Sequence, residues 1–175
     1  MMEQQAIVQA VQNAARDVFA TMLDLELNEG EPYIEKIPPG PSEGVISVIG
    51  MAGKWIGTGS LCCSGALARR LSAQLLMMEF DQVNEEVLDA VAEVTNMIIG
   101  NFKNLAEPHL GPLGLTIPTV IYGLKFVARS AGKESWTVIP FRCAGELLEI
   151  KILLTPNRGF SQMMSHPAAT QPARS

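Results

Sequence analysis

The sequence predicts an α/β (α+β) fold, in which amphipathic helices are combined with antiparallel β-hairpins. Apolar residues recur at the helical spacing of three and four over three segments, residues 4–23, 65–78 and 84–107. β-branched and aromatic residues mark two hairpins, one within residues 44–63 and one within residues 135–154. With 175 residues and 47% hydrophobic content, the chain is long enough to bury a core in one domain.

The charge of the chain excludes two classes of partner. Its net charge is -5 and its pI is near 5.0, whereas a nucleic acid or an anionic membrane surface requires clustered Lys and Arg. The opening MMEQQAIVQAVQNAARDVF lacks the basic region of a secretion signal, and no apolar run reaches the length of a membrane span. We therefore expect no nucleic-acid partner, no membrane partner and a cytoplasmic location.

The cysteines and histidines predict no metal or redox site. Cys62 and Cys63 are adjacent, so on a strand they face opposite sides and do not share a metal or a bridge. Together with Cys143 they are expected to be small apolar residues in a reducing cytoplasm. His109 and His166 have no partner at a recognisable spacing, and catalytic-triad, P-loop and zinc patterns are missing.

The first helix is predicted over residues 4–23, and a short edge strand follows at residues 33–37 before a Pro- and Gly-rich turn. The buried face of this helix is expected to contain Ile7, Val8, Val11, Ala15, Val18, Phe19 and Met22. Residues 44–51 and 54–63 then form the first hairpin. Gly57 and Gly59 in its second strand indicate either a bulge or close backbone packing.

The second helix is predicted over residues 65–78, with Ser64 as its N-cap. Its buried face is expected to contain Leu67, Leu71, Leu75 and Met78. Arg69 and Arg70 lie off that face, where they either form a solvated surface or meet an acidic partner.

The C-terminal part is predicted to be mostly strand. Residues 115–123 and strands near 125–129 precede the second hairpin, whose last strand, ELLEIKILL, alternates so that one face is wholly apolar. Cys143-Ala144-Gly145 is a short link, which predicts an antiparallel pair. The domain is expected to span residues 1–155, and residues 156–175, rich in Ser, Pro, Gln and Ala, to form a disordered tail.

The third helix, over residues 84–107, separates into an apolar and a polar face. Asn84 is its predicted cap and Pro108 its predicted stop. The apolar face is expected to contain Val87, Val91, Val94, Ile98, Phe102 and Leu105. The opposite stripe consists of Asp89, Glu93, Asn96, Gly100 and Lys103, at spacings of four, three, four and three.

Glu93 and Asn96 are the candidate catalytic pair. A carboxylate accepts hydrogen bonds or pairs with a cation, whereas a carboxamide both donates and accepts. Gly100 lies beneath them, and a glycine inside a helix costs roughly 1 kcal/mol relative to alanine, so close approach by another surface is one use for it. The periodicity alone favours an ordinary solvated face, so the pair depends on the wider pattern.

The wider pattern carries a family resemblance. LDAVAEVTNMIIGNFKN, then LTIPTVIYG, then TVIPFRCAGELLEIKILL resemble the CheX-type chemotaxis phosphatases, which are relatives of CheC and FliY. The resemblance covers roughly residues 4–155. Its most specific part is D-x-x-x-E-x-x-N-x-x-x-G-N, from Asp89 to Asn101. A second E-x-x-N is missing, so the chain is more similar to single-site CheX than to two-site CheC.

The resemblance implies long helices on a mixed, largely antiparallel sheet, and often a homodimer. It also implies hydrolysis of the aspartyl phosphate of a response-regulator receiver domain such as CheY. Glu93 would then pair with a receiver lysine and Asn96 would orient the attacking water, while Asp89, Gly100, Asn101 and Lys103 would contact the partner. Mg²⁺ would come with the receiver, and the chain would have no cofactor of its own. The alternative function is a non-catalytic module that binds a phosphorylated receiver or serves as a scaffold.

Overall fold

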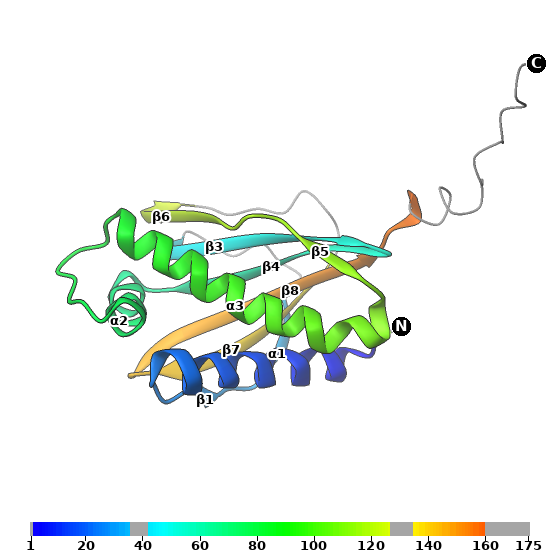
Figure 1. Cartoon of the computed structure of the whole chain (residues 1–175), viewed down its shortest axis with the longest axis horizontal. Helices are drawn as coiled ribbons and strands as arrows, with labels where there is room; N and C mark the ends of the chain where they lie inside the picture. Colours follow the sequence, from blue (N-terminus) through cyan, green and yellow to red (C-terminus); the bar gives the residue numbers. More distant parts are fainter. Residues whose placement is uncertain (1, 36–41, 127–134, 160–175) are drawn as a thin grey trace, which may run out of the picture.

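Helices cover one face of a β-sheet in the computed structural model, which describes residues 2–35, 42–126 and 135–159 (Figure 1). The helices are α1 (Gln4–Val18), α2 (Gly65–Leu76) and α3 (Glu85–Leu110). α1 and α3 lie side by side across the sheet, and α2 lies at one end of it (Figure 1). The predicted α+β fold is confirmed.

The sheet has eight strands in the order β1-β7-β8-β4-β3-β5, with β2 paired to β7 and β6 paired to β3. The strands are β1 (Asn28–Glu29), β2 (Tyr33–Glu35), β3 (Ser42–Gly53), β4 (Trp55–Cys63), β5 (Leu113–Leu115), β6 (Thr119–Phe126), β7 (Trp136–Cys143) and β8 (Glu146–Pro156). Every pairing between described strands is antiparallel, so this part of the sheet is not mixed.

Both predicted hairpins are confirmed, and the two glycines of β4 mark close packing. The β3–β4 register runs without a shift through Gly57 and Gly59, so neither glycine forms a bulge. A Cβ on Gly57 would lie 1.9 Å from the carbonyl oxygen of Leu153, and one on Gly59 would lie 2.6 Å from Cδ1 of Ile99. Gly57 leaves no room for a Cβ beside the Leu153 backbone, whereas a Cβ at Gly59 would force the buried Ile99 side chain to shift.

The α3 face that packs on the sheet is nearly the predicted one. Val87, Val91, Val94, Ile98 and Phe102 are all fully buried, as the periodicity predicts. Leu105 was predicted to join them, but 46% of it is exposed. The core-facing side continues instead in steps of four after Phe102, through Ala106 and Leu110, and this turns Leu105 outward.

The predicted end of α3 at Pro108 is wrong, because the helix continues to Leu110. Proline removes only one hydrogen bond when it lies in the last turn of a helix. That turn is completed by the Gly111 N–H, which donates to the Glu107 carbonyl at 2.8 Å. Leu110 is buried, and Gly111, with φ of 77°, then ends the helix. His109 is therefore in the exposed last turn and not in a loop.

The end of the first helix also differs from the prediction. Residues Phe19–Leu23 form a π-helical turn, and Asp24 follows in the left-handed region. The wider turn rotates the side chains after Phe19 relative to an α-helix. As a result Leu23 is buried, whereas Met22, predicted to be buried, is 50% exposed.

Side-chain caps hold the starts of α2 and α3 as predicted. Ser64 Oγ accepts from the Leu67 N–H, and Asn84 Oδ1 accepts from the Val87 N–H, both at 3.0 Å. The end of α2 is earlier than predicted, at Leu76, so Met78 lies beyond the helix and is 52% exposed.

The described chain extends slightly past the predicted domain end at residue 155. β8 ends at Pro156, and Asn157 Nδ2 donates to the Gly53 carbonyl at 3.0 Å. The predicted tail from residue 160 onward, including His166, lies outside the described residues, as do residues 36–37 and 127–129 of two predicted strands. None of the helices in the described ranges has the length and apolarity of a membrane span.

Candidate functional site

The outer face of α3 carries the predicted polar stripe. Asp89, Glu93 and Asn96 are exposed, and Gly100 and Lys103 are partly exposed. The opposite face of the helix is anchored by fully buried apolar side chains, so the stripe has a fixed orientation. The structure thus brings these five residues together along one line, roughly 20 Å long at 1.5 Å per residue.

Glu93 and Asn96 are one helical turn apart and point away from the core. Thr95, next to Asn96 in the chain, is fully buried on the core side, where its Oγ1 donates to the Val91 carbonyl of the same helix at 2.8 Å. Within the described part of the chain, neither the Glu93 carboxylate nor the Asn96 carboxamide makes a hydrogen bond or an ion pair. Their hydrogen-bonding capacity is therefore available to solvent or to another molecule.

Gly100 is not required by packing within the described chain. A Cβ at this position would have no atom within 4 Å, in contrast to Gly57 and Gly59 of β4. An α-helix also needs no glycine conformation there, so an alanine would be more stable by about 1 kcal/mol. The open space above Gly100 is thus compatible with close approach by a partner.

An open groove of about 500 Å³ lies between the stripe and β5. It is lined by Asn96, Met97, Gly100, Asn101, Lys103, Asn104, Leu113, Gly114 and Leu115. β5 reaches this position because Leu115 pairs with Met51 of β3. Asn104 was not among the predicted site residues, although it lies four residues after Gly100 on the same side of the helix. β5 was not predicted either, because its long-range pairing has no local signal.

Lys103 is held in place at the end of the groove by Glu107. The Lys103 Nζ lies 3.0 Å from Glu107 Oε1, and the same carboxylate accepts from the Leu113 N–H at 3.0 Å. The hydrogen bond from Leu113, together with Lys103, lowers the pKa of Glu107 below its ordinary value. Glu107 thereby joins α3 to β5 and fixes the lysine beside the stripe.

Asn101 lies to one side of the stripe. Its Nδ2 donates to Asp17 Oδ2 of α1 at 3.2 Å, so its side chain is directed toward the neighbouring helix. It lines both the groove and a second hollow between α1 and α3, where Leu105 also lies.

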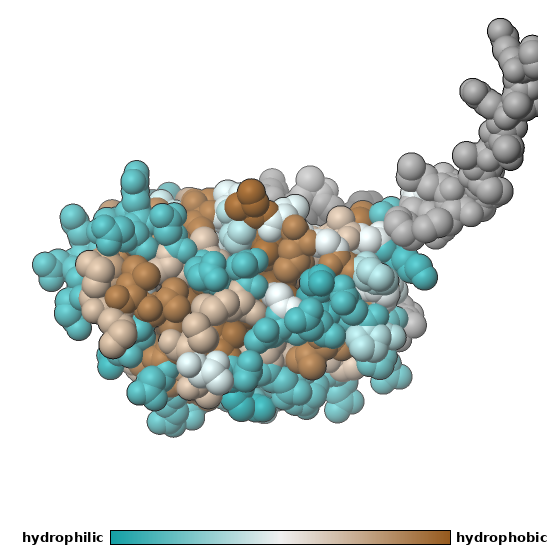
Figure 2. Space-filling view, viewed as in Figure 1, coloured by the Kyte–Doolittle hydropathy of each residue, from teal (hydrophilic) through white to brown (hydrophobic). Residues whose placement is uncertain are grey.

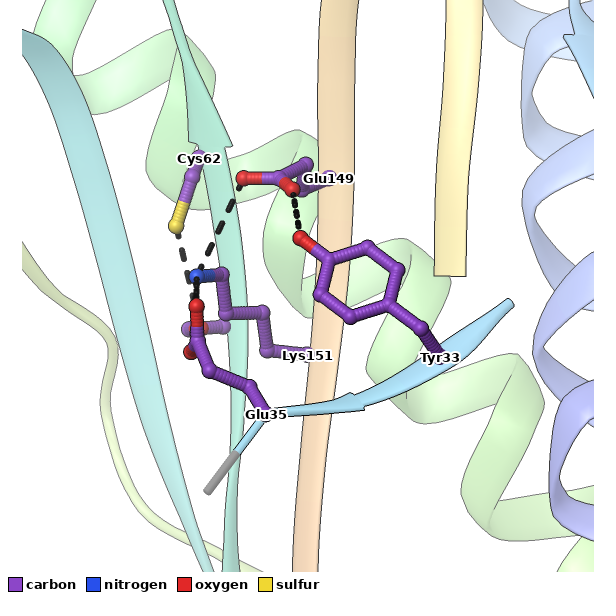
Figure 3. Close-up of polar contacts among 6 residues, drawn as sticks. Tyr33, Glu35, Cys62, Glu149 and Lys151 are labelled. Carbon is purple, nitrogen blue, oxygen red and sulfur yellow. Dashed lines mark hydrogen bonds and ion pairs between the residues drawn. The ribbon is translucent and has the colours of Figure 1, made fainter. Parts of the chain in front are cut away.

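A second polar cluster lies on the sheet face that α1 and α3 do not cover (Figure 3). Lys151 Nζ is 3.1 Å from Glu35 Oε2 and 3.8 Å from Glu149 Oε2. The Tyr33 hydroxyl donates to Glu149 Oε1 at 2.7 Å, so the cluster joins the edge strand β2 to β8. Burial and this hydrogen bond raise the pKa of Tyr33 above its ordinary value.

The cysteines are free thiols, and none of them is activated. Cys62 lies beside the second polar cluster (Figure 3), whereas Cys63 and Cys143 are buried in the core. Burial raises the pKa of Cys62 to about 11 and that of Cys63 to about 12, which keeps both thiols protonated. Among the described residues no group of three His, Cys, Asp or Glu side chains is placed to hold a metal ion.

Comparison with known proteins places this architecture in a family. The family model described as "Chemotaxis phosphatase CheX" matches residues 45–142, which is more than half of the chain. The chain belongs to the CheX family. The matched region contains all of α3 and β5, and so both walls of the groove.

Individual CheX proteins agree with this assignment. The CheY-P phosphatase CheX of Thermotoga maritima is 32% identical over 132 residues, which are 72% of this chain and 81% of that protein. A crystal structure of CheX from Vibrio vulnificus has a TM-score of 0.76 at 27% identity, covering 85% of this chain and 99% of that one.

A further solved relative is CheX of Borrelia burgdorferi, crystallised as a CheX–CheY–BeF3–Mg²⁺ complex. It has a TM-score of 0.72 at 25% identity and covers 88% of this chain and 99% of that chain.

Proposed function

We propose that this protein hydrolyses the aspartyl phosphate of a CheY-like receiver domain, with Glu93 and Asn96 of α3 as the residues that act on the partner. The observation that carries the proposal is an exposed carboxylate and carboxamide, one turn apart and without partners in the described chain. Membership of the CheX family, one of whose members is a CheY-P phosphatase, supports the choice of substrate.

Asn96 is proposed to orient the attacking water. Phosphoryl transfer passes through a loose transition state, in which positioning and charge compensation supply most of the catalysis. The Asn96 amide has both a donor and an acceptor, so it holds a water in line with the phosphorus without acting as a base.

Glu93 is proposed to pair with a lysine of the receiver. Glu93 and Asn96 are three residues apart on α3, or about 5 Å along the helix axis. A carboxylate–ammonium contact at Glu93 therefore fixes where Asn96 stands relative to the phosphate.

The neighbouring residues are proposed to seat the partner. Gly100 leaves open space for a close backbone approach, and Lys103 offers a fixed positive charge at the end of the groove. Asp89 extends the acidic side of the stripe one turn before Glu93, and Asn101 contacts the partner from the α1 side.

The Mg²⁺ needed for this chemistry is proposed to belong to the receiver. In the Borrelia relative, Mg²⁺ and BeF3 are present together with CheY. The hydrolytic centre would be formed by Glu93 and Asn96 of this chain together with the metal, lysine and phosphate of the receiver. This chain then needs no cofactor of its own.

We also propose a cytoplasmic location, because receiver domains act inside the cell. The three free thiols are compatible with that location.

We further propose that two copies of the chain pair along β6. Within the described residues, β6 pairs with β3 on one side and has no strand on the other. Its side chains Ile121, Tyr122 and Leu124 are 45%, 43% and 72% exposed, which is unusual for an edge strand of a monomer.

Sedimentation equilibrium tests this pairing. The wild-type protein should be a dimer, and Leu124→Lys should shift the equilibrium toward the monomer. A monomeric wild-type protein at micromolar concentration would contradict this pairing.

The test of the proposed activity is a phosphate-loss assay on each receiver encoded with this protein. Wild type should shorten the phosphate lifetime of at least one receiver, and Glu93→Ala and Asn96→Ala should each remove most of that effect. Saturable, phosphorylation-dependent binding with an unchanged phosphate lifetime would show a binding module instead.

A further inference from the structure

The C-terminal end of α2 exposes three consecutive apolar side chains. Leu76, Met77 and Met78 are 41%, 91% and 52% exposed. Met22, 50% exposed, belongs to the π-helical turn that packs against α2. In Figure 2 brown and tan side chains gather over the end of the molecule that holds α2, next to the polar side chains of α3. We call Leu76, Met77 and Met78 the α2 tip.

The backbone of the α2 tip would be more stable with a glycine. Met77 is in the left-handed region, with φ of 54° and ψ of 41°, and its N–H donates to the Ala73 carbonyl. The Met78 N–H donates to the same carbonyl at 3.2 Å, which completes the cap. Glycine is the usual residue at such a position because a Cβ there is strained. Met77 is therefore an exposed apolar residue at a position where both solubility and backbone stability would favour glycine.

The α2 tip is a fixed projection of the fold. Arg69 Nη1 donates to the Asp81 carbonyl at 2.9 Å and to the Phe80 carbonyl at 3.4 Å, so the segment after the tip is bound back onto α2. Ser72 Oγ donates to the Val87 carbonyl at 3.2 Å, which joins α2 to the first turns of α3. A surface that is already ordered loses little entropy when a partner covers it.

The tip is close enough to the α3 stripe to share one partner. From the Ser72–Val87 contact, Met77 is five residues away along α2 and Glu93 is six residues away along α3, or about 8 and 9 Å. A protein bound through an interface of about 800 Å² covers roughly 15 Å in every direction from its centre. A receiver whose interface is centred between the α3 stripe and α2 would therefore cover both Glu93 and the tip.

We infer that the α2 tip is a second contact with the receiver domain and determines which receiver binds. This inference rests on the proposed function. The charges of the α3 stripe suit features that receivers share, namely a lysine and a phosphorylated aspartate. The flexible methionine side chains would instead contact apolar surface of the receiver outside these shared features, where receivers can differ.

The test is Met77→Gly, measured by binding to a cognate receiver loaded with Mg²⁺ and BeF3. Glycine removes the side chain and relieves the left-handed strain, so the thermal midpoint should stay the same or rise. Affinity should fall roughly ten-fold, with kcat for phosphate loss unchanged at saturation. The control is Ile56→Thr, which removes a 43% exposed apolar side chain at the end of β4 far from α2 and should leave affinity unchanged.

The possible outcomes separate this inference from the proposed activity. Unchanged receiver affinity in Met77→Gly overturns the role of the tip, even if wild type hydrolyses the phosphate. A wild type that binds without hydrolysis, and a Met77→Gly variant that binds more weakly, overturn the activity but support the tip. A Met77→Gly variant that changes sedimentation state while keeping its receiver affinity overturns the inference and assigns the tip to contact between copies of this chain.

Discussion

Two groups of polar side chains lie on opposite sides of the molecule, and they differ in whether the chain itself satisfies them. On the uncovered sheet face, Lys151 is paired with Glu35 and Glu149, and its side chain is only 12% exposed. On α3, Glu93 and Asn96 are exposed, and their side chains make no hydrogen bond or ion pair within the described chain. Both groups lie on the polar faces of amphipathic elements.

The difference indicates a different use for each group. The Lys151 ammonium is so little exposed that it must be paired, because burying an unpaired charge costs free energy. Its ion pair with Glu35 therefore stabilises the attachment of β2 to the sheet. An exposed carboxylate and carboxamide cost little when left to water. Held in one direction by a buried helix face, they are instead available to complete a site on another protein.

The largest expected effect is from Glu93→Lys. If Glu93 pairs with a receiver lysine, the change places two positive charges together, and kcat/KM for phosphate loss should fall at least 100-fold, or about 2.7 kcal/mol. Glu31→Lys makes the same charge change at an exposed residue between β1 and β2 and is the control. Equal effects of the two variants would show that only net charge matters.

Lys151→Met tests the other group and should affect stability without affecting activity. It leaves Glu35 and Glu149 facing each other in a half-buried site, which should cost about 2 kcal/mol and lower the thermal midpoint by about 5 °C. Tyr33→Phe removes one hydrogen bond and should cost only about 1 kcal/mol. A folded Lys151→Met protein with a reduced kcat would contradict the separation of the two groups.

Gly100→Leu should have a smaller effect on activity than Glu93→Lys, and its effects on stability and on receiver binding should have opposite signs. A Cβ at Gly100 meets no atom within 4 Å, and leucine favours the helix, so stability should rise by up to about 0.8 kcal/mol. Receiver affinity, by titration with the BeF3-loaded receiver, should fall about ten-fold because the open space is filled. Gly59→Ala is the contrast, since its Cβ would lie 2.6 Å from Ile99 and should destabilise the fold. Unchanged affinity in Gly100→Leu would exclude close approach there.

Local pattern was enough to predict the three helices, the two hairpins and the direction of the candidate pair. The caps at Ser64 and Asn84 and the burial of Val87, Val91 and Ile98 all follow from residue type and helical period, and they fix Glu93 and Asn96 on the outer face. The resemblance based on Asp89 to Asn101 correctly gave the family, which periodicity alone could not supply.

What the sequence did not predict depends on non-local packing. The π-helical turn that exposes Met22 and the continuation of α3 past Pro108 both depend on which neighbouring side chain becomes buried. The groove needs β5 beside α3, and β5 is placed by pairing with β3, which lies 60 to 64 residues earlier in the chain. The left-handed backbone of Met77 has no sequence signal, because glycine is the residue that normally marks it.

The most direct test is the phosphate lifetime of a cognate receiver at saturating concentrations of wild type and of Asn96→Ala. Wild type should shorten the lifetime at least 100-fold, and Asn96→Ala should leave it at the value of the receiver alone, while both bind the BeF3-loaded receiver equally well. That result would assign the chemical step to Asn96. An Asn96→Ala variant that binds and shortens the lifetime as wild type does would contradict the account.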